Sequence, residues 1–366
     1  MVPMAVTFAD KLARMPHYEA GLHMSDARET YETDDVVKLA SNECPWPPHP
    51  AVLEVIAAEA ASANRYPDQH ARLLRRRIAE RYDFDPAGIS VGNGSCEILL
   101  AGAVALCDPQ DEIVYAWPAF SIYPHLAALS GAREIRVPLT GDYGHDLESM
   151  LTEVTAATQL LIVCNPNNPT GTHIPADELS AFVERVPDHV TVVLDEAYVE
   201  FQVHDDADAS LDLVRRHPNV VALRTFSKVY GLAALRVGYG LGSARFRSAV
   251  HAVRQPFPVN GVAQAAAAEA ILHQDEVVAR VERTVAERLW VEEELGELGV
   301  RTADTHANFS WVALGDRDED EVVEALGRAG VIVRPGGQLG GPGHIRVTHG
   351  TRAENERFLR ALREVL

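Results

Sequence analysis

Short apolar runs rich in β-branched residues alternate with helical segments through the first two thirds of the chain. These runs are residues 89–92, 111–117, 132–139, 159–164, 189–194, 220–226 and 236–242. Near-continuous apolar strands that alternate with helices are typical of a parallel sheet with both faces covered. The pattern therefore predicts an α/β domain with a mainly parallel sheet covered by helices.

The pattern changes after about residue 257. A long Ala-rich helical region, Val262–Leu298, is followed by a strand at 307–314, a charged helix at Glu319–Ala329, strands around 331–335 and 344–350, and a C-terminal helix. This order predicts a smaller α+β domain. The first residues are mixed and weakly periodic, and we interpret them as an arm that lies over another part of the structure. The predicted division is an arm at 1–35, a large domain at 36–260 and a small domain at 261–366.

Composition narrows the class of protein. The chain has 366 residues, 47% hydrophobic and 23% charged, as is ordinary for a soluble protein with a large core. A formal net charge of −20 argues against nucleic-acid and anionic-membrane partners, because phosphate groups repel an acidic protein. No apolar run is long enough to span a membrane and the N-terminus does not resemble a signal peptide, so we predict a cytoplasmic protein. The four cysteines form no CxxC pair and indicate neither a disulfide framework nor a zinc site.

Polar residues stand where three of the apolar runs end. Asn165 and Asn168 follow the run at 159–164, Asp195 and Tyr198 follow the next, and Lys228 comes after the run at 220–226. Ligands bind at the carboxyl ends of the strands in open α/β sheets. We therefore expect these side chains to share one site.

Lys228 has neighbours that suit a reactive amine beside an anion site. Thr225, Ser227 and Arg236 surround it in the sequence TFSKVYGLAALRVGY. A desolvated lysine loses its proton more easily and attacks carbonyl groups, whereas hydroxyls and a guanidinium bind phosphate oxygens. The alternative for Lys228 alone is an ordinary surface lysine in a strand-to-helix loop.

A second anion site is indicated where the run at 89–92 turns into a helix. The turn GNGS precedes Cys96, and backbone amides at the start of a helix bind anions when glycines allow close approach. The alternative is a tight structural turn. Because no complete GxGxxG opens a βαβ unit, a nicotinamide-dependent dehydrogenase is disfavoured.

With these motifs in order, the chain resembles the fold-type I pyridoxal-phosphate aminotransferases, and specifically the histidinol-phosphate aminotransferases with their aromatic-aminotransferase relatives. The resemblance extends from about Tyr18 to Arg352. It rests on LASNE at Leu39, RYPD at Arg65, GNGSCE at Gly92, NPNNPTG at Asn165, DEAYVEF at Asp195, SKVYGLAALRVGY at Ser227, ANF at Ala307, VRP at Val333 and HIRVT at His344. It implies a large α/β domain with a mainly parallel sheet of the seven-stranded type, and a smaller α+β C-terminal domain.

The resemblance also implies a role for each residue around the cofactor, pyridoxal 5′-phosphate. Lys228 would hold the cofactor covalently and then move the substrate proton, and Asp195 would pair with the pyridinium nitrogen. Asn168 and Tyr198 would hydrogen-bond the phenolic oxygen, and Phe120 would stack on the ring. The phosphate would be held by Thr225, Ser227, Arg236 and the helix-start amides near Ser95 and Cys96.

By the same resemblance, Tyr66 reaches into the site of a neighbouring subunit, which implies a homodimer with shared active sites. Tyr18, Arg334 and Arg346 match residues that bind the anionic end of the substrate, with Asn168 also in contact. The implied reaction is transamination between L-histidinol phosphate and 2-oxoglutarate in histidine synthesis. No metal is implied.

Three alternatives remain open. Stretches such as VALRTFSKVYGLAALR fit an aromatic amino acid aminotransferase equally well, with phenylalanine as the expected substrate of that alternative. A pyridoxal-phosphate decarboxylase or lyase would keep the fold and the cofactor. A catalytically silent binding protein is disfavoured by the intact set of cofactor residues. The sequence departs from the usual pattern of the family at Cys96, at Ala234 and in the arm sequence YEAG. These departures bear more on the assignment of the substrate than on the assignment of the cofactor.

Overall fold

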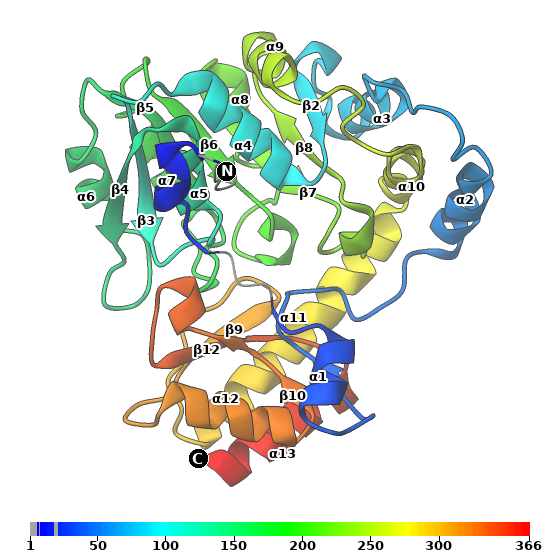
Figure 1. Ribbon diagram of the computed structural model, residues 1–366, viewed down its shortest axis with the longest axis vertical. Helices are drawn as coiled ribbons and strands as arrows, with labels where there is room; N and C mark the ends of the chain where they lie inside the picture. The colour runs from blue at the N-terminus through cyan, green and yellow to red at the C-terminus, as the bar shows by residue number, and fades with distance from the viewer. Residues whose placement is uncertain (1–5, 7, 18–20) are drawn as a thin grey trace, which may run out of the picture.

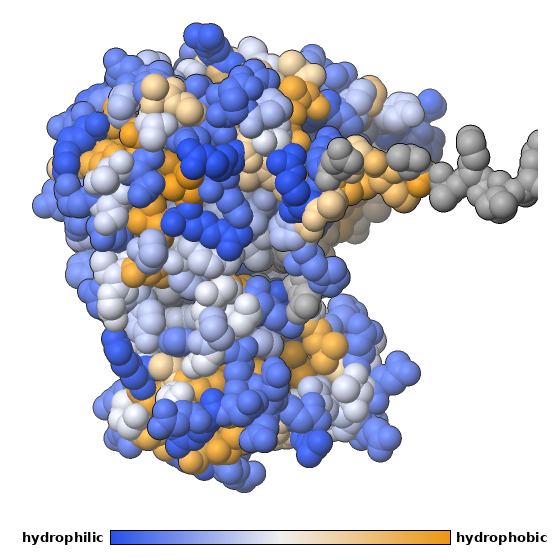
Figure 2. Space-filling view, turned by 60° about the vertical axis from the view of Figure 1, so that its left-hand side comes forward, coloured by the Kyte–Doolittle hydropathy of each residue, from blue (hydrophilic) through white to orange (hydrophobic). Residues whose placement is uncertain are grey.

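The computed structural model of the chain describes residue 6, residues 8–17 and residues 21–366. A large lobe and a small lobe are joined by the long helix α11 (Gln274–Glu297), which runs from one into the other (Figure 1). The surface in Figure 2 is mostly hydrophilic, with hydrophobic patches on both lobes. Among the described residues, no helix is long and apolar enough to cross a membrane.

The large lobe is built on one seven-stranded sheet, which confirms the predicted fold class. Its strands are β2 (Ile89–Gly92), β3 (Glu112–Trp117), β4 (Arg133–Pro138), β5 (Thr158–Cys164), β6 (Thr191–Asp195), β7 (Val220–Thr225) and β8 (Gly238–Leu241). Their spatial order is β2-β8-β7-β6-β5-β3-β4. Only β8 is reversed, since it pairs antiparallel with both β2 and β7 while the other pairs are parallel.

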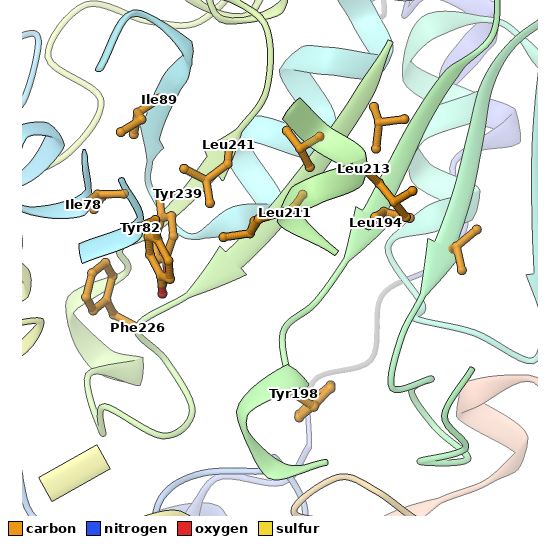
Figure 3. Close-up of a cluster of buried hydrophobic side chains, with 14 of the residues drawn as sticks. Ile78, Tyr82, Ile89, Leu194, Tyr198, Leu211, Leu213, Phe226, Tyr239 and Leu241 are labelled. Carbon is orange, nitrogen blue, oxygen red and sulfur yellow. The ribbon is translucent and has the colours of Figure 1, made fainter. Parts of the chain in front are cut away.

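Helices cover both faces of this sheet. The helices of the large lobe are α2 (Pro50–Ala60), α3 (Arg72–Tyr82), α4 (Ser95–Leu106), α5 (Tyr123–Ser130), α6 (Leu147–Thr152), α7 (Ala176–Val183), α8 (Leu211–Arg216), α9 (Ala244–Val253) and α10 (Gly261–Ala270). Alternate residues of one strand enter opposite cores: Leu161 and Val163 of β5 join one cluster, whereas Leu160 and Ile162 join the other. Figure 3 shows part of the first cluster, where Phe226 and Tyr239 pack beside Tyr82. The two-sided burial explains why a central strand such as β5 is almost entirely apolar, whereas the edge strand β4 carries Arg133, Glu134 and Arg136.

The small lobe carries a three-stranded antiparallel sheet of order β11-β12-β9. Its elements are β9 (Phe309–Ala313), α12 (Glu319–Arg328), β10 (Val331–Ile332), β11 (Arg334–Pro335), β12 (His344–Thr348) and α13 (Arg352–Val365). The Ala-rich region predicted before it divides into α10 and α11. The first of these helices packs on α2 and α3 of the large lobe, and the second packs on α13.

The N-terminal segment contributes to the small lobe. Helix α1 (Met24–Thr30) is followed by β1 (Val37–Lys38), which pairs in parallel with β10. Short 3₁₀ helices lie at Asp10–Arg14, Pro86–Gly88, Val199–Phe201, Ala233–Leu235 and Gly337–Leu339. The predicted boundaries at residues 35 and 260 stay predictions. The pairing of β1 with β10 in a separate two-stranded sheet shows that the chain just after the arm belongs in part to the small lobe.

Candidate active site

A cavity of about 390 Å³ lies where the carboxyl ends of the large sheet face the small lobe. The predicted site residues that line it are Ser95, Cys96, Phe120, Asn168, Asp195, Tyr198, Thr225, Ser227, Lys228, Arg236, Arg334 and Arg346. Tyr66 does not line this cavity, and Tyr18 lies outside the described residues. The structure thus brings together nearly all the residues that the strand-end pattern and the resemblance indicated.

The parallel sheet brings these residues together, because they lie at or just after the carboxyl ends of neighbouring strands. Asp195 is the last residue of β6 and pairs with Cys164, the last residue of β5. Thr225 ends β7, the strand beside β6 on its other side. Because parallel strands end at the same edge, the loops that follow them carry Asn168 and Lys228 into one place.

Lys228 is held close to the N-terminal segment. Its Nζ donates a hydrogen bond to the backbone oxygen of Ser41 at 3.0 Å. Burial, and after it the nearby guanidinium of Arg346, lowers the pKa of Lys228 to about 7. A large fraction of this side chain is therefore the neutral, nucleophilic amine near neutral pH, as the sequence predicted for a desolvated lysine.

Asp195 lines the cavity, and its two carboxylate oxygens differ in their hydrogen bonding. Its Oδ2 accepts a hydrogen bond from the Tyr123 hydroxyl at 2.9 Å. Its Oδ1 is buried and has no hydrogen-bond partner among the described residues. Burial raises the pKa of this carboxyl to about 6. An unsatisfied buried carboxylate oxygen beside a cavity suits a protonated ring nitrogen, which is the group that pyridoxal phosphate would place there.

The start of α4 forms an anion cradle. No side chain caps this helix, and Gly94 at its N-cap has a φ of 75°. A Cβ on Gly94 would lie 2.7 Å from a terminal nitrogen of Arg236, so glycine leaves room for the guanidinium above the helix start. Helix-start amides and an arginine side chain together suit a phosphate group.

The hydroxyls predicted for the phosphate site lie at the same place. Thr225 Oγ1 accepts a hydrogen bond from the backbone N–H of Ser227 at 3.0 Å, and Arg236 Nη1 lies 3.5 Å from Ser227 Oγ. Burial raises the pKa of the Cys96 thiol to about 11, so its side chain stays neutral beside an anion. The departure at Cys96 therefore does not place a negative charge in the cradle.

Tyr198 and Asn168 are oriented by neighbours that sequence reasoning did not identify for this role. The Asn42 amide donates to the Tyr198 hydroxyl at 2.9 Å, which directs the hydroxyl's own proton elsewhere. Arg346 donates to Asn168 Oδ1 at 2.5 Å and to the backbone oxygen of Ala40 at 2.8 Å. Because Asn168 uses its carbonyl oxygen for that bond, its NH₂ is the group that can donate into the cavity.

Two residues of the site were not singled out from the sequence. Asn42 belongs to the motif LASNE and has a φ of 53°, and Tyr123 follows Phe120 in the stretch WPAFSIY. The motifs containing them were noticed, but nothing in the spacing showed that these two side chains would bond to Tyr198 and Asp195.

Arg334 and Arg346 face each other across two adjacent strands. They are direct partners in the antiparallel pairing of β11 with β12, and both are buried while lining the cavity. Like charges directly opposite each other are destabilising in a sheet, so the pair forms a site suited to an anion.

Tyr66 stands apart from the other predicted residues. It lies between α2 and α3, is 83% exposed and stacks on Phe257 with 4.7 Å between ring centroids. Its predicted role in a neighbouring subunit stays a prediction.

Comparison with known proteins shows the family to which the chain belongs. The family model "Aminotransferase class I and II" matches residues 34–362. An aromatic amino acid aminotransferase of Rhodococcus erythropolis is 41% identical over 348 residues, covering 95% of this chain and 93% of the relative. A histidinol-phosphate aminotransferase of Geobacillus thermodenitrificans is 40% identical over 357 residues, covering 98% and 97%.

Solved structures show the same fold. The histidinol-phosphate aminotransferase of Sinorhizobium meliloti, in complex with pyridoxal 5′-phosphate, has a TM-score of 0.89 at 26% identity, covering 100% of this chain and 99% of that one. An aspartate aminotransferase of Thermus thermophilus shares the fold, with a TM-score of 0.87 at 24% identity, covering 99% and 100%. The chain belongs to the class I and II aminotransferases, enzymes that use pyridoxal 5′-phosphate.

Proposed function

We propose that this aminotransferase transfers the amino group of L-histidinol phosphate to 2-oxoglutarate, giving imidazole acetol phosphate and L-glutamate. The observation that carries the proposal is the buried pair Arg334 and Arg346, in direct register on neighbouring strands and lining the cavity. Two permanent cations suit a phosphate dianion better than a single carboxylate. The relatives named histidinol-phosphate aminotransferases support the same substrate.

The cofactor residues divide into those that hold its phosphate and those that act on its ring. We assign the phosphate to Thr225, Ser227, Arg236 and the amides at the start of α4, and we assign one ring face to Phe120. When bound, pyridoxal phosphate supplies the carbonyl that takes up the amino group and a ring that withdraws electrons.

Three side chains handle protons in this proposal. Lys228 would hold the cofactor through Nζ and, as a free amine, would take the proton from the substrate carbon, a role that its pKa of about 7 favours. Asp195 Oδ1 holds a proton on the ring nitrogen, which is the task its buried, unpartnered position suits. Tyr198 donates toward the phenolic oxygen, since its hydroxyl already accepts from Asn42.

The second candidate is an aromatic amino acid aminotransferase acting on phenylalanine. It is favoured by the relatives from Rhodococcus and Streptomyces that carry this name, at 41–44% identity. Phe120 and Leu339 also give the cavity apolar surface against which a phenyl ring could pack. The experiment that separates the two is a comparison of kcat/KM for histidinol phosphate and for phenylalanine with 2-oxoglutarate as acceptor, and we expect the phosphorylated substrate to be preferred.

Arg334→Ala is expected to penalise the phosphorylated substrate more than phenylalanine. We expect kcat/KM for histidinol phosphate to fall by about 10- to 150-fold, the equivalent of ~1.5–3 kcal/mol for hydrogen bonds to a charged group. The measured quantity is the ratio of the two kcat/KM values within one variant, which cancels any general loss of active protein.

The matched control is Arg328→Ala, because Arg328 lies on α12 of the same lobe, pairs with Glu324 and has a side chain that is 74% exposed. This variant should leave the ratio unchanged. A wild-type preference for phenylalanine, or an equal loss on both substrates in Arg334→Ala, would place the enzyme with the aromatic aminotransferases.

We further propose a homodimer in which Tyr66 completes the site of the partner. The exposure of Tyr66 and its position outside its own subunit's cavity support this arrangement. Mixing inactive Lys228→Ala subunits with Tyr66→Phe subunits should restore activity, because one site of each heterodimer then has both groups. Random assembly would return about a quarter of the wild-type sites.

The control for that experiment mixes Tyr66→Phe subunits with subunits carrying both substitutions. No heterodimer in this mixture has a site with both Lys228 and Tyr66, so no activity should return. Activity that stays at the level of the separate variants in the first mixture would mean that Tyr66 does not serve the partner's site.

A further inference from the structure

Tyr123 is buried directly behind the carboxylate of Asp195. Its side chain is 1% exposed, and its hydroxyl donates to Asp195 Oδ2 at 2.9 Å. The other oxygen, Oδ1, is buried and has no hydrogen-bond partner among the described residues, and Asp195 itself lines the cavity. The two oxygens of one carboxylate are therefore in different environments, and Tyr123 is the side chain that makes them different.

The position of the Tyr123 hydroxyl is set by packing. Tyr123 begins α5, and its ring meets Tyr115 edge-on with centroids 5.5 Å apart and Phe120 edge-on at 5.9 Å. All three rings belong to the core on one face of the sheet or pack against it. Because this core is close-packed, the ring cannot turn without displacing its neighbours, and the hydroxyl is a fixed donor.

Few other groups stabilise the charge of Asp195. The titratable groups that face it are Cys96 from α4, Tyr123 from α5, Cys164 from β5, and Glu196 and Tyr198 beside it in the chain. Burial raises the pKa of Cys96, Tyr123, Cys164 and Tyr198, so these four stay neutral.

The remaining neighbour, Glu196, carries a negative charge that disfavours ionisation of Asp195, although it is itself bonded to Arg224 at 2.8 Å. The groups that favour the ionised form of Asp195 are the Tyr123 hydroxyl and the backbone N–H of Ala197. Burial acts against them and leaves the pKa of Asp195 at about 6. A single hydroxyl thus has a large share in keeping this carboxylate charged at neutral pH.

We propose that Tyr123 is a positioning residue: its hydroxyl turns Asp195 so that Oδ1 faces the cofactor, and keeps the carboxylate ionised so that it can hold a proton on the ring nitrogen. This role rests on the proposed function of Asp195. It goes beyond that function because it assigns the orientation and the ionisation of the Asp195 carboxylate to Tyr123, a residue that does not line the cavity.

Tyr123→Phe tests the proposal, because phenylalanine keeps the ring and its packing and removes only the donor. In the cofactor-free full-length protein, an infrared titration of the carboxyl groups should show that the pKa of Asp195 has risen, with Asp195→Asn identifying its signal. In the loaded enzyme, the acidic limb of the kcat profile should move to higher pH. At neutral pH we expect kcat to fall about tenfold while KM for 2-oxoglutarate stays within about twofold, since the lost bond is one to a charged group.

Two comparisons separate this role from a structural one. Tyr115→Phe removes a hydroxyl from the same aromatic cluster, but that hydroxyl bonds to Glu134, so the titration and the kcat profile should stay as in the wild type. In an Asp195→Asn background, adding Tyr123→Phe should cause little further loss, because the two residues act through one contact.

The outcomes are distinct. In one outcome, the wild-type protein binds pyridoxal phosphate, and Tyr123→Phe has the same pKa of Asp195 and the same kcat as the wild type. The proposed role of Tyr123 is then overturned, and the proposed function stands. If Tyr123→Phe and Tyr115→Phe cause equal losses without a shift in either pH titration, Tyr123 is only a packing residue. If the wild-type protein does not bind the cofactor, the assignment of Asp195 fails first.

Discussion

Lys228→Ala is expected to abolish transamination and to remove the visible absorbance of the lysine-bound cofactor. Alanine provides neither the amine that holds the cofactor nor the base that moves the substrate proton, and no other lysine in the described part of the chain lines the cavity. The sequence contains only three lysines, Lys11, Lys38 and Lys228, so the site of attachment can be identified without ambiguity. Borohydride reduction of wild-type protein followed by peptide mapping should find the cofactor on Lys228.

The control for this prediction is Lys38→Ala. Lys38 lies in β1 close to the cavity and pairs with Glu43 at 3.0 Å, so its loss removes a cation from the same region. This variant should keep the absorbance and most of the turnover. Reduction that fixes the cofactor on Lys38 or Lys11 would show that the assignment of Lys228 is wrong.

Asp195→Asn is expected to retain bound cofactor but to lose most of the turnover. An amide cannot stabilise a protonated ring nitrogen as a carboxylate does, so the ring of the cofactor would withdraw electrons from the substrate less strongly. The loss should be about 10²- to 10³-fold in kcat, ~2.7–4 kcal/mol, the range found for preorganised electrostatic groups. Cofactor absorbance and kcat, measured on the same preparation, test this expectation, and Asp212→Asn on the exposed surface of α8 is the control. Near-wild-type kcat in Asp195→Asn would contradict it.

The same substitution should stabilise the protein when the cofactor is absent. Burial raises the pKa of Asp195 in the folded state to about 6, above its ordinary value of 3.8. The folded state therefore binds more protons than the unfolded state between these values, and the free energy of unfolding falls as the pH rises through this interval. Asparagine has no charge to bury, so urea unfolding at neutral pH should show greater stability for cofactor-free Asp195→Asn than for cofactor-free wild type.

Most strands of the large sheet were predictable because each is apolar enough to be recognised alone. All seven predicted runs form strands, and in the central strands burial on both faces demands continuous apolar sequence. The edge strand β4 has a mixed sequence and is partly exposed. The Ala-rich region was harder, because alanine favours a helix without indicating where the chain turns between α10 and α11. The position of the site at the strand ends followed from the parallel topology.

The contacts within the site were not predictable, because they join residues that are distant in the sequence. Asn42 meets Tyr198, and Tyr123 meets Asp195, only after the helices have packed on the sheet. The register that places Arg334 opposite Arg346 is a further example, since the pairing of two short strands depends on the whole small lobe. The roles assigned to these residues, and to Tyr66, remain predictions for the experiments above.

The reversed strand β8 explains how Lys228 and Arg236 can serve one cofactor from a single short loop. Strand β7 delivers the chain to the rim of the cavity at Thr225, and β8 leaves the same rim at Gly238 in the opposite direction. A parallel strand would begin at the far edge of the sheet, so the chain would first have to cross back over one face of it. The loop at residues 226–237 instead stays at the rim of the cavity, and strand pairing fixes both of its ends. An insertion between Lys228 and Arg236 should therefore uncouple covalent attachment from phosphate binding while leaving the sheet intact.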